Sequence, residues 1–82
     1  MKNTPTTHIS SDLKILAGKP TIKGTRISVE FILELLRSGM TIQDIASEYE
    51  HLKRADVEAA IVFAKHAVAK HRVYSISDYI TA

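Results

Sequence analysis

The feature that most constrains the fold is a series of three short segments with helical hydrophobic spacing between residues 29 and 72. In each segment, apolar residues recur three and four positions apart, which places them on one face of an α-helix. Isolated helices of this length are marginal in water, so the three segments must bury their apolar faces in one shared core. The sequence therefore predicts a mainly α-helical domain.

Capping residues and glycine set the boundaries of the first two helices. Ser28 is a good N-cap for a helix from Val29 to about Ser38, and Gly39 ends it. Thr41 caps a second helix, with Asp44 at its third position in a capping-box arrangement. The expected buried faces are Val29, Ile32, Leu33 and Leu36, widened by Phe31 and Leu35, and then Ile42, Ile45, Ala46 and Tyr49.

A break at Glu50-His51-Leu52 precedes a third helix, from about Arg54 to Arg72. The second and third helices, joined by a brief turn, have the proportions of a helix-turn-helix. The residues expected on the buried side of the third helix are Val57, Ala60, Ile61, Phe63, Ala64, Ala67 and Val68. The predicted fold class is thus a trihelical, homeodomain-like helix-turn-helix domain.

The segment before the first helix is extended in character. Thr21-Ile22-Lys23 alternates polar and apolar residues, and Pro20 favours an extended backbone at Lys19. We therefore expect one or two very short β-strands to precede the helices.

Length and composition limit the class of protein. Eighty-two residues make one domain at most, and the absence of cysteine excludes disulfides and thiol chemistry. No apolar run approaches the roughly 20 residues of a membrane span, and no signal-peptide pattern begins the chain. We expect a cytoplasmic protein without membrane attachment. Its predicted parts are a flexible arm (1–7), a folded domain (8–72) and a C-terminal, partner-binding tail (73–82).

Catalytic, metal and nucleotide sites are not expected. Gly18–Arg26 contains two glycines and three cations, but a P-loop requires Lys and then Ser or Thr after its second glycine. Gly18 and Gly24 instead allow turns with positive φ. His66 and His71 lie about 140° apart on a helix and cannot bind one metal ion from one face. The sequence therefore predicts no enzyme activity and no cofactor.

Charge is unevenly distributed, with +4 over residues 1–27, −4 over 28–58 and +2 over 59–82. Attraction to phosphate supplies most non-specific DNA affinity, so the acidic middle counts against a simple DNA-binding role. The expected DNA contacts, should the chain bind DNA, are Lys53, Arg54, Lys19, Lys23 and Arg26. A trihelical domain that contacts only proteins is the alternative.

Several motifs together resemble the domain of unknown function 433 family. They are Gly18-Lys19-Pro20 with Gly24-Thr25-Arg26-Ile27, Ile32–Leu36, Gly39-Met40-Thr41, Ile45–Tyr49, His51-Leu52 and Asp56–Ala60. The resemblance covers residues 8–68 and implies a helix-turn-helix domain preceded by short strands, often dimeric. It also implies a VapB-like antitoxin role, in which the protein binds a PIN-like ribonuclease toxin encoded beside it.

One position departs from the family pattern. Where the family usually has Ser or Thr as the cap of the third helix, this chain has Lys53. A nearby acid can compensate, and Asp56 is the residue expected to assist this helix N-terminus.

The leading hypothesis is therefore a type II antitoxin that acts as a homodimer and regulates its own operon through DNA. PIN-like nucleases hold metal in an acidic pocket, which a cationic segment can fill. The candidate toxin-binding residues are Lys70, His71 and Arg72, with Tyr74, Ile76, Tyr79 and Ile80 as apolar anchors. The alternatives are a stand-alone DNA-binding regulator and a dimeric structural module without a toxin.

Overall fold

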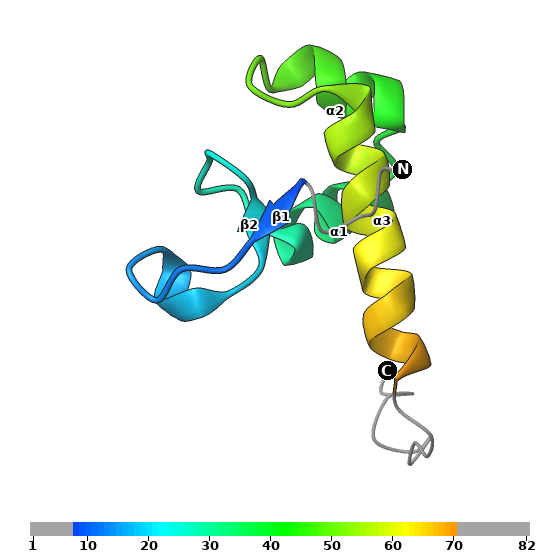
Figure 1. The fold of residues 1–82 in the computed structure, drawn as a ribbon. Coiled ribbons are helices and arrows are strands. Elements are labelled where there is room, and N and C mark those ends of the chain that lie inside the picture. The colour runs from blue at the N-terminus through cyan, green and yellow to red at the C-terminus, as the bar shows by residue number, and fades with distance from the viewer. Residues whose placement is uncertain (1–7, 71–82) are drawn as a thin grey trace.

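The computed structural model describes residues 8–70. The elements follow in the order β1 (Ile9–Ser10), the short 3-10 helix η2 (Leu16–Gly18), β2 (Thr21–Ile22), α1 (Val29–Arg37), α2 (Ile42–Glu48) and α3 (Arg54–Ala69). Figure 1 shows α3 as the long element on the right, with α2 near its N-terminal end and the strands to its left. The predicted fold, three helices preceded by very short strands, is confirmed.

The predicted N-caps of α1 and α2 are both formed. The Ser28 hydroxyl accepts a hydrogen bond from the Phe31 amide at 2.9 Å. At α2, the Thr41 hydroxyl accepts from the Asp44 amide at 3.0 Å, and the Asp44 carboxylate accepts from the Thr41 amide at 2.9 Å. These hydrogen bonds hold the pKa of Asp44 below its ordinary value, because they favour the charged carboxylate. The α2 capping box is therefore at full strength at neutral pH.

α3 begins at Arg54, as predicted, and the side chain of its N-cap, Lys53, makes no capping hydrogen bond. A lysine side chain has no acceptor oxygen, but Asp56 Oδ2 accepts a hydrogen bond from the Lys53 amide at 3.0 Å. Asp56 Oδ1 lies 3.1 Å from His8 Nδ1, 48 residues earlier in the chain. The Asp56 carboxylate thus stabilises the N-terminus of α3 and also connects it to the start of the N-terminal hairpin.

β1 and β2 form an antiparallel pair, with Ile9 opposite Ile22 and Ser10 opposite Thr21. Thr21 and Ile22 are each only 1% exposed: β1 pairs with β2 and contacts α3, and Ile22 belongs to the same core cluster as Val29 and Ile32 of α1. Gly24 turns the chain after β2 with φ +83°, a conformation that glycine adopts without strain. This turn brings residues 25–28 back along β2 and into the N-terminus of α1.

The core lies where the hairpin, α1 and α2 meet the first turns of α3. Its buried apolar residues are Ile22, Val29, Ile32, Ile45, Leu52, Val57 and Ala60. From α3, only Val57, Ala59 and Ala60 are buried. Within residues 8–70, none of the helices combines the length and the hydropathy needed to cross a bilayer.

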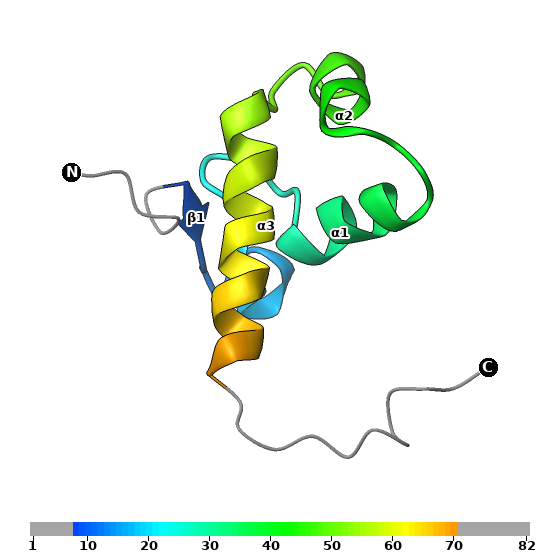
Figure 2. The ribbon, with the colours of Figure 1, turned by 90° about the vertical axis from the view of Figure 1, so that its right-hand side faces the viewer.

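The predicted burial of the second half of α3 is wrong. Ile61 and Ala67 are exposed, Val68 is 59% exposed, and Phe63 and Ala64 are only half-buried. The cause is length: α3 has 16 residues and spans about 24 Å, whereas α1 has nine residues and α2 has seven. The last turns of α3 therefore extend beyond the two helices that pack against it (Figure 2).

α3 ends at Ala69, slightly earlier than expected, and Lys70 is its C-cap. The predicted arm over residues 1–7 lies outside the described residues, as do His71, Arg72 and the predicted tail over 73–82.

Candidate functional site

A hollow near the α2–α3 turn brings two cations of the segment after β2 beside His51. It has a volume of about 450 Å³ and is lined by residues 23–27 and His51. Lys23 and Arg26, both predicted to contact DNA, therefore lie beside the turn that leads into Lys53 and Arg54. We call Lys23, Arg26, His51, Lys53 and Arg54 the basic corner. His51 was not predicted to belong to it, since nothing in its local sequence indicates which loop it faces.

The predicted DNA-binding residues do not all belong to this corner. Lys19 lies apart from it, with its Nζ atom 3.0 Å from Glu30 Oε1 on α1. Arg54 donates from Nε to Glu58 at 3.2 Å, an exposed pair of the kind that contributes little to stability. Within the described part of the chain, Lys23, Arg26 and Lys53 form no ion pair with an acid. Of the five predicted DNA-binding residues, these three are therefore the most readily available to phosphate.

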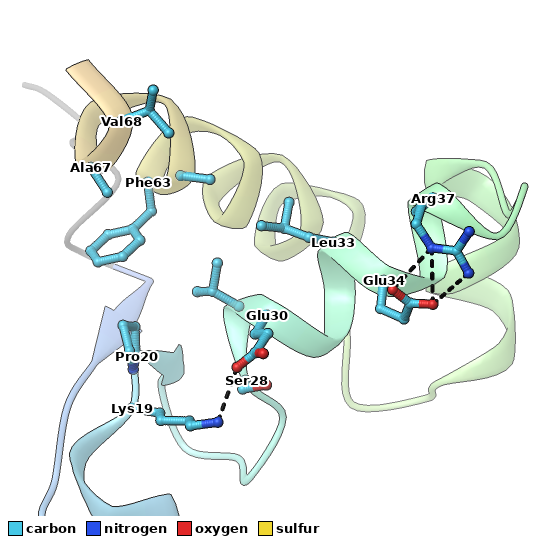
Figure 3. A pocket seen from close by; sticks show the side chains of 12 residues that line it. Lys19, Pro20, Ser28, Glu30, Leu33, Glu34, Arg37, Phe63, Ala67 and Val68 are labelled. Atoms are coloured by element: carbon cyan, nitrogen blue, oxygen red, sulfur yellow. Dashed lines mark hydrogen bonds and ion pairs between the residues drawn. The ribbon is translucent and has the colours of Figure 1, made fainter. Parts of the chain in front are cut away.

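A second hollow, which we call the apolar groove, lies between α1 and the second half of α3 (Figure 3). It has a volume of about 620 Å³. Its apolar walls come from Pro20, Val29 and Leu33 on one side and from Phe63, Ala64 and Ala67 on the other. In Figure 3, Phe63 points from α3 toward Pro20 across the groove. Because the second half of α3 extends beyond the core, its apolar side chains form an open apolar surface.

The rim of the apolar groove carries two ion pairs and no net charge. One pair is Lys19 with Glu30, and the other is Arg37 with Glu34, joined at 2.6 Å between Nη2 and Oε2 (Figure 3). The hydrogen bonds from Arg37 lower the pKa of Glu34, and the same bonds raise the pKa of Arg37. Both groups therefore stay charged and matched at neutral pH. A neutral apolar groove suits an apolar ligand better than nucleic acid.

Of the predicted toxin-binding residues, the structure places only Lys70, which is exposed at the C-terminal end of α3. The other six, His71, Arg72, Tyr74, Ile76, Tyr79 and Ile80, lie outside the described residues. Sequence reasoning missed the apolar groove because it assigned Phe63 and Ala67 to the core. The sequence signal that could have revealed the groove is the length of the apolar face of α3. This face is longer than α1 and α2 can cover.

The chain matches the family described as Protein of unknown function (DUF433) over residues 9–64. This match runs from β1 into the second half of α3, so it includes the basic corner and most of the apolar groove. No curated protein and no solved structure matches the chain.

Proposed function

The chain belongs to the DUF433 family, and from this premise we propose that it is the antitoxin of a type II toxin–antitoxin pair. In this proposal it neutralises a PIN-like ribonuclease by direct binding, in the cytoplasm. The family description itself names no function, and the surface of the molecule supports the proposal.

The observation that carries the proposal is the apolar groove beside the end of α3. Contiguous apolar surface on a small protein commonly marks a site of protein interaction. The groove leads to Lys70, the first of the cations proposed to enter the acidic pocket of the nuclease. In the sequence, the α3 residues that line the groove are thus followed by the cationic segment and then by the aromatic anchors.

Co-expression with the product of the adjacent gene tests this proposal. We expect the full chain to co-purify with that product and to suppress its ribonuclease activity. A chain truncated after Val68 should bind at least about 30-fold more weakly, because it loses the anchors Tyr74 and Tyr79. The control variant is Gln43→Ala, which changes an exposed residue of α2 away from the groove and should bind normally. Undiminished binding by the truncated chain contradicts the assignment of these residues.

Operator binding is a second candidate function, favoured by the basic corner. We propose that the chain binds DNA as a homodimer, since two-fold symmetry doubles the phosphate contacts available to a small domain. Lys53 is the N-cap of α3, the third helix of the helix-turn-helix, and Lys23 and Arg26 line a hollow together with His51 of the turn that precedes α3.

Titration of promoter DNA at several salt concentrations tests this second role. Lys53→Ala and Arg26→Ala should each weaken binding and lower the slope of log affinity against log salt by about 1, because each removes one phosphate contact. Lys19→Ala is the matched control, since Lys19 pairs with Glu30 at the apolar groove and should leave the slope unchanged. Equal effects of all three variants, or no preference for the promoter at any salt, contradict DNA binding through the basic corner.

A further inference from the structure

The apolar groove opens at the point where the described chain ends. Ala67 forms part of its wall and lies three residues before Lys70. Phe63 and Leu33 are only half-buried, so their apolar surfaces face this opening without full cover from the rest of residues 8–70. Burial of such surface is favourable by about 25 cal/mol per Å². The groove therefore favours an apolar occupant.

The twelve residues that follow Lys70 have the composition and length of such an occupant. They include Val73, Tyr74, Ile76, Tyr79 and Ile80, and between residues 73 and 82 the only charged side chain is Asp78. Twelve residues reach about 40 Å when extended, whereas α1, which forms one wall of the groove, is about 14 Å long. The segment can therefore turn back at the end of α3 and still cross the whole groove.

A second copy of the chain fits the groove less well. Twelve residues line the groove, whereas a stable interface usually engages about 20–30 residues on each side. A tethered segment also has an effective concentration in the millimolar range, far above that of a second molecule. The neutral rim, made of Lys19 with Glu30 and Glu34 with Arg37, imposes no charge penalty on a segment in which Arg72 and Asp78 balance each other.

From these observations we propose that residues 71–82 dock in the apolar groove of the same molecule. The proposal concerns the chain alone and goes beyond the antitoxin proposal, since it holds or fails without reference to a toxin.

The absence of native cysteine allows a direct test by disulfide trapping in the full chain. One variant carries Glu30→Cys on the groove rim together with Ser77→Cys in the segment. The matched control carries Lys65→Cys with Ser77→Cys. Lys65 is exposed and lies two residues from both Phe63 and Ala67, which places it about 160° around α3 from each.

A docked segment should close the disulfide in E30C/S77C at least about 10-fold faster than in K65C/S77C, as a closed monomer at low micromolar concentration. If the segment moves freely, the disulfide should close faster in K65C/S77C, because the loop between positions 65 and 77 is much shorter than the loop between positions 30 and 77. Equal rates, or faster closure of the control, overturn the proposal. Covalent dimers of E30C/S77C also overturn it, because they assign the groove to a second copy.

A second comparison tests whether apolar contacts are responsible for the faster disulfide formation in E30C/S77C. Ile76→Ser and Tyr79→Ser, added to E30C/S77C, should reduce its rate to that of the control. An unchanged rate overturns docking through these anchors. Thermal unfolding of all variants checks that each is folded. Because every measurement uses the chain alone, a negative result leaves the antitoxin proposal standing, and failure to find a toxin leaves this proposal standing.

Discussion

Replacing Ile32 with alanine is expected to lower the free energy of unfolding by about 2–5 kcal/mol. Ile32 is 0% exposed and lies on α1 at the centre of the core, among Val29, Ile45 and Val57. The substitution removes buried apolar surface and leaves a cavity that three short helices can close only in part. A domain of this size has few kcal/mol to spare, so a large unfolded fraction is expected near physiological temperature.

Denaturant unfolding followed by circular dichroism measures this effect. Leu13→Ala is the control, since Leu13 is 85% exposed and its truncation should change stability by no more than about 0.5 kcal/mol. Similar losses for the two variants contradict the position of the core. The comparison also tests the topology, because Ile32 becomes central only when α1 packs against α3.

Asp56→Ala should be the second most damaging change, with a loss of about 1–3 kcal/mol. The Asp56 carboxylate accepts the hydrogen bond from the Lys53 amide that closes the start of α3, and it also contacts His8. Its side chain is 17% exposed, so water only partly replaces the lost contacts. One substitution therefore weakens both the third helix and the attachment of the hairpin.

A double-mutant cycle with His8→Ala separates these two contributions. We expect His8→Ala to be milder than Asp56→Ala, and the pair to show a coupling energy of at least about 0.5 kcal/mol. Glu58→Ala, which removes only the exposed contact with Arg54, serves as the control and should change stability by no more than about 0.5 kcal/mol. Additive effects of the two substitutions contradict the contact between hairpin and helix.

Much of the fold could be predicted because its signals are local. Ser28, Thr41 and Asp44 act through hydrogen bonds within four residues, so the sequence alone indicates where α1 and α2 begin. Gly24 and Pro20 act on the backbone at or next to their own positions. The family resemblance was likewise carried by short motifs, and the match over residues 9–64 confirms it.

The candidate sites were harder to predict, because they depend on distances between elements. Hydrophobic periodicity assigns Phe63 and Ala67 to the apolar face of α3, but it gives no information on how far α1 reaches along that face. Similarly, Lys19 and Lys23 are near neighbours in sequence, yet the extended β2 between them carries one to the apolar groove and the other to the basic corner. The contact between His8 and Asp56 has no local signal at all.

The length of α3 also fixes the spacing between the two candidate sites. Arg54 and the groove-lining residues 63–68 are about 14–21 Å apart along one continuous helix. An α-helix of about four turns is rigid. The distance between a molecule bound at one end and a molecule bound at the other end is therefore fixed. In the two proposals above, α3 would therefore hold a nucleic acid at the basic corner and a protein at the apolar groove at a fixed distance from each other.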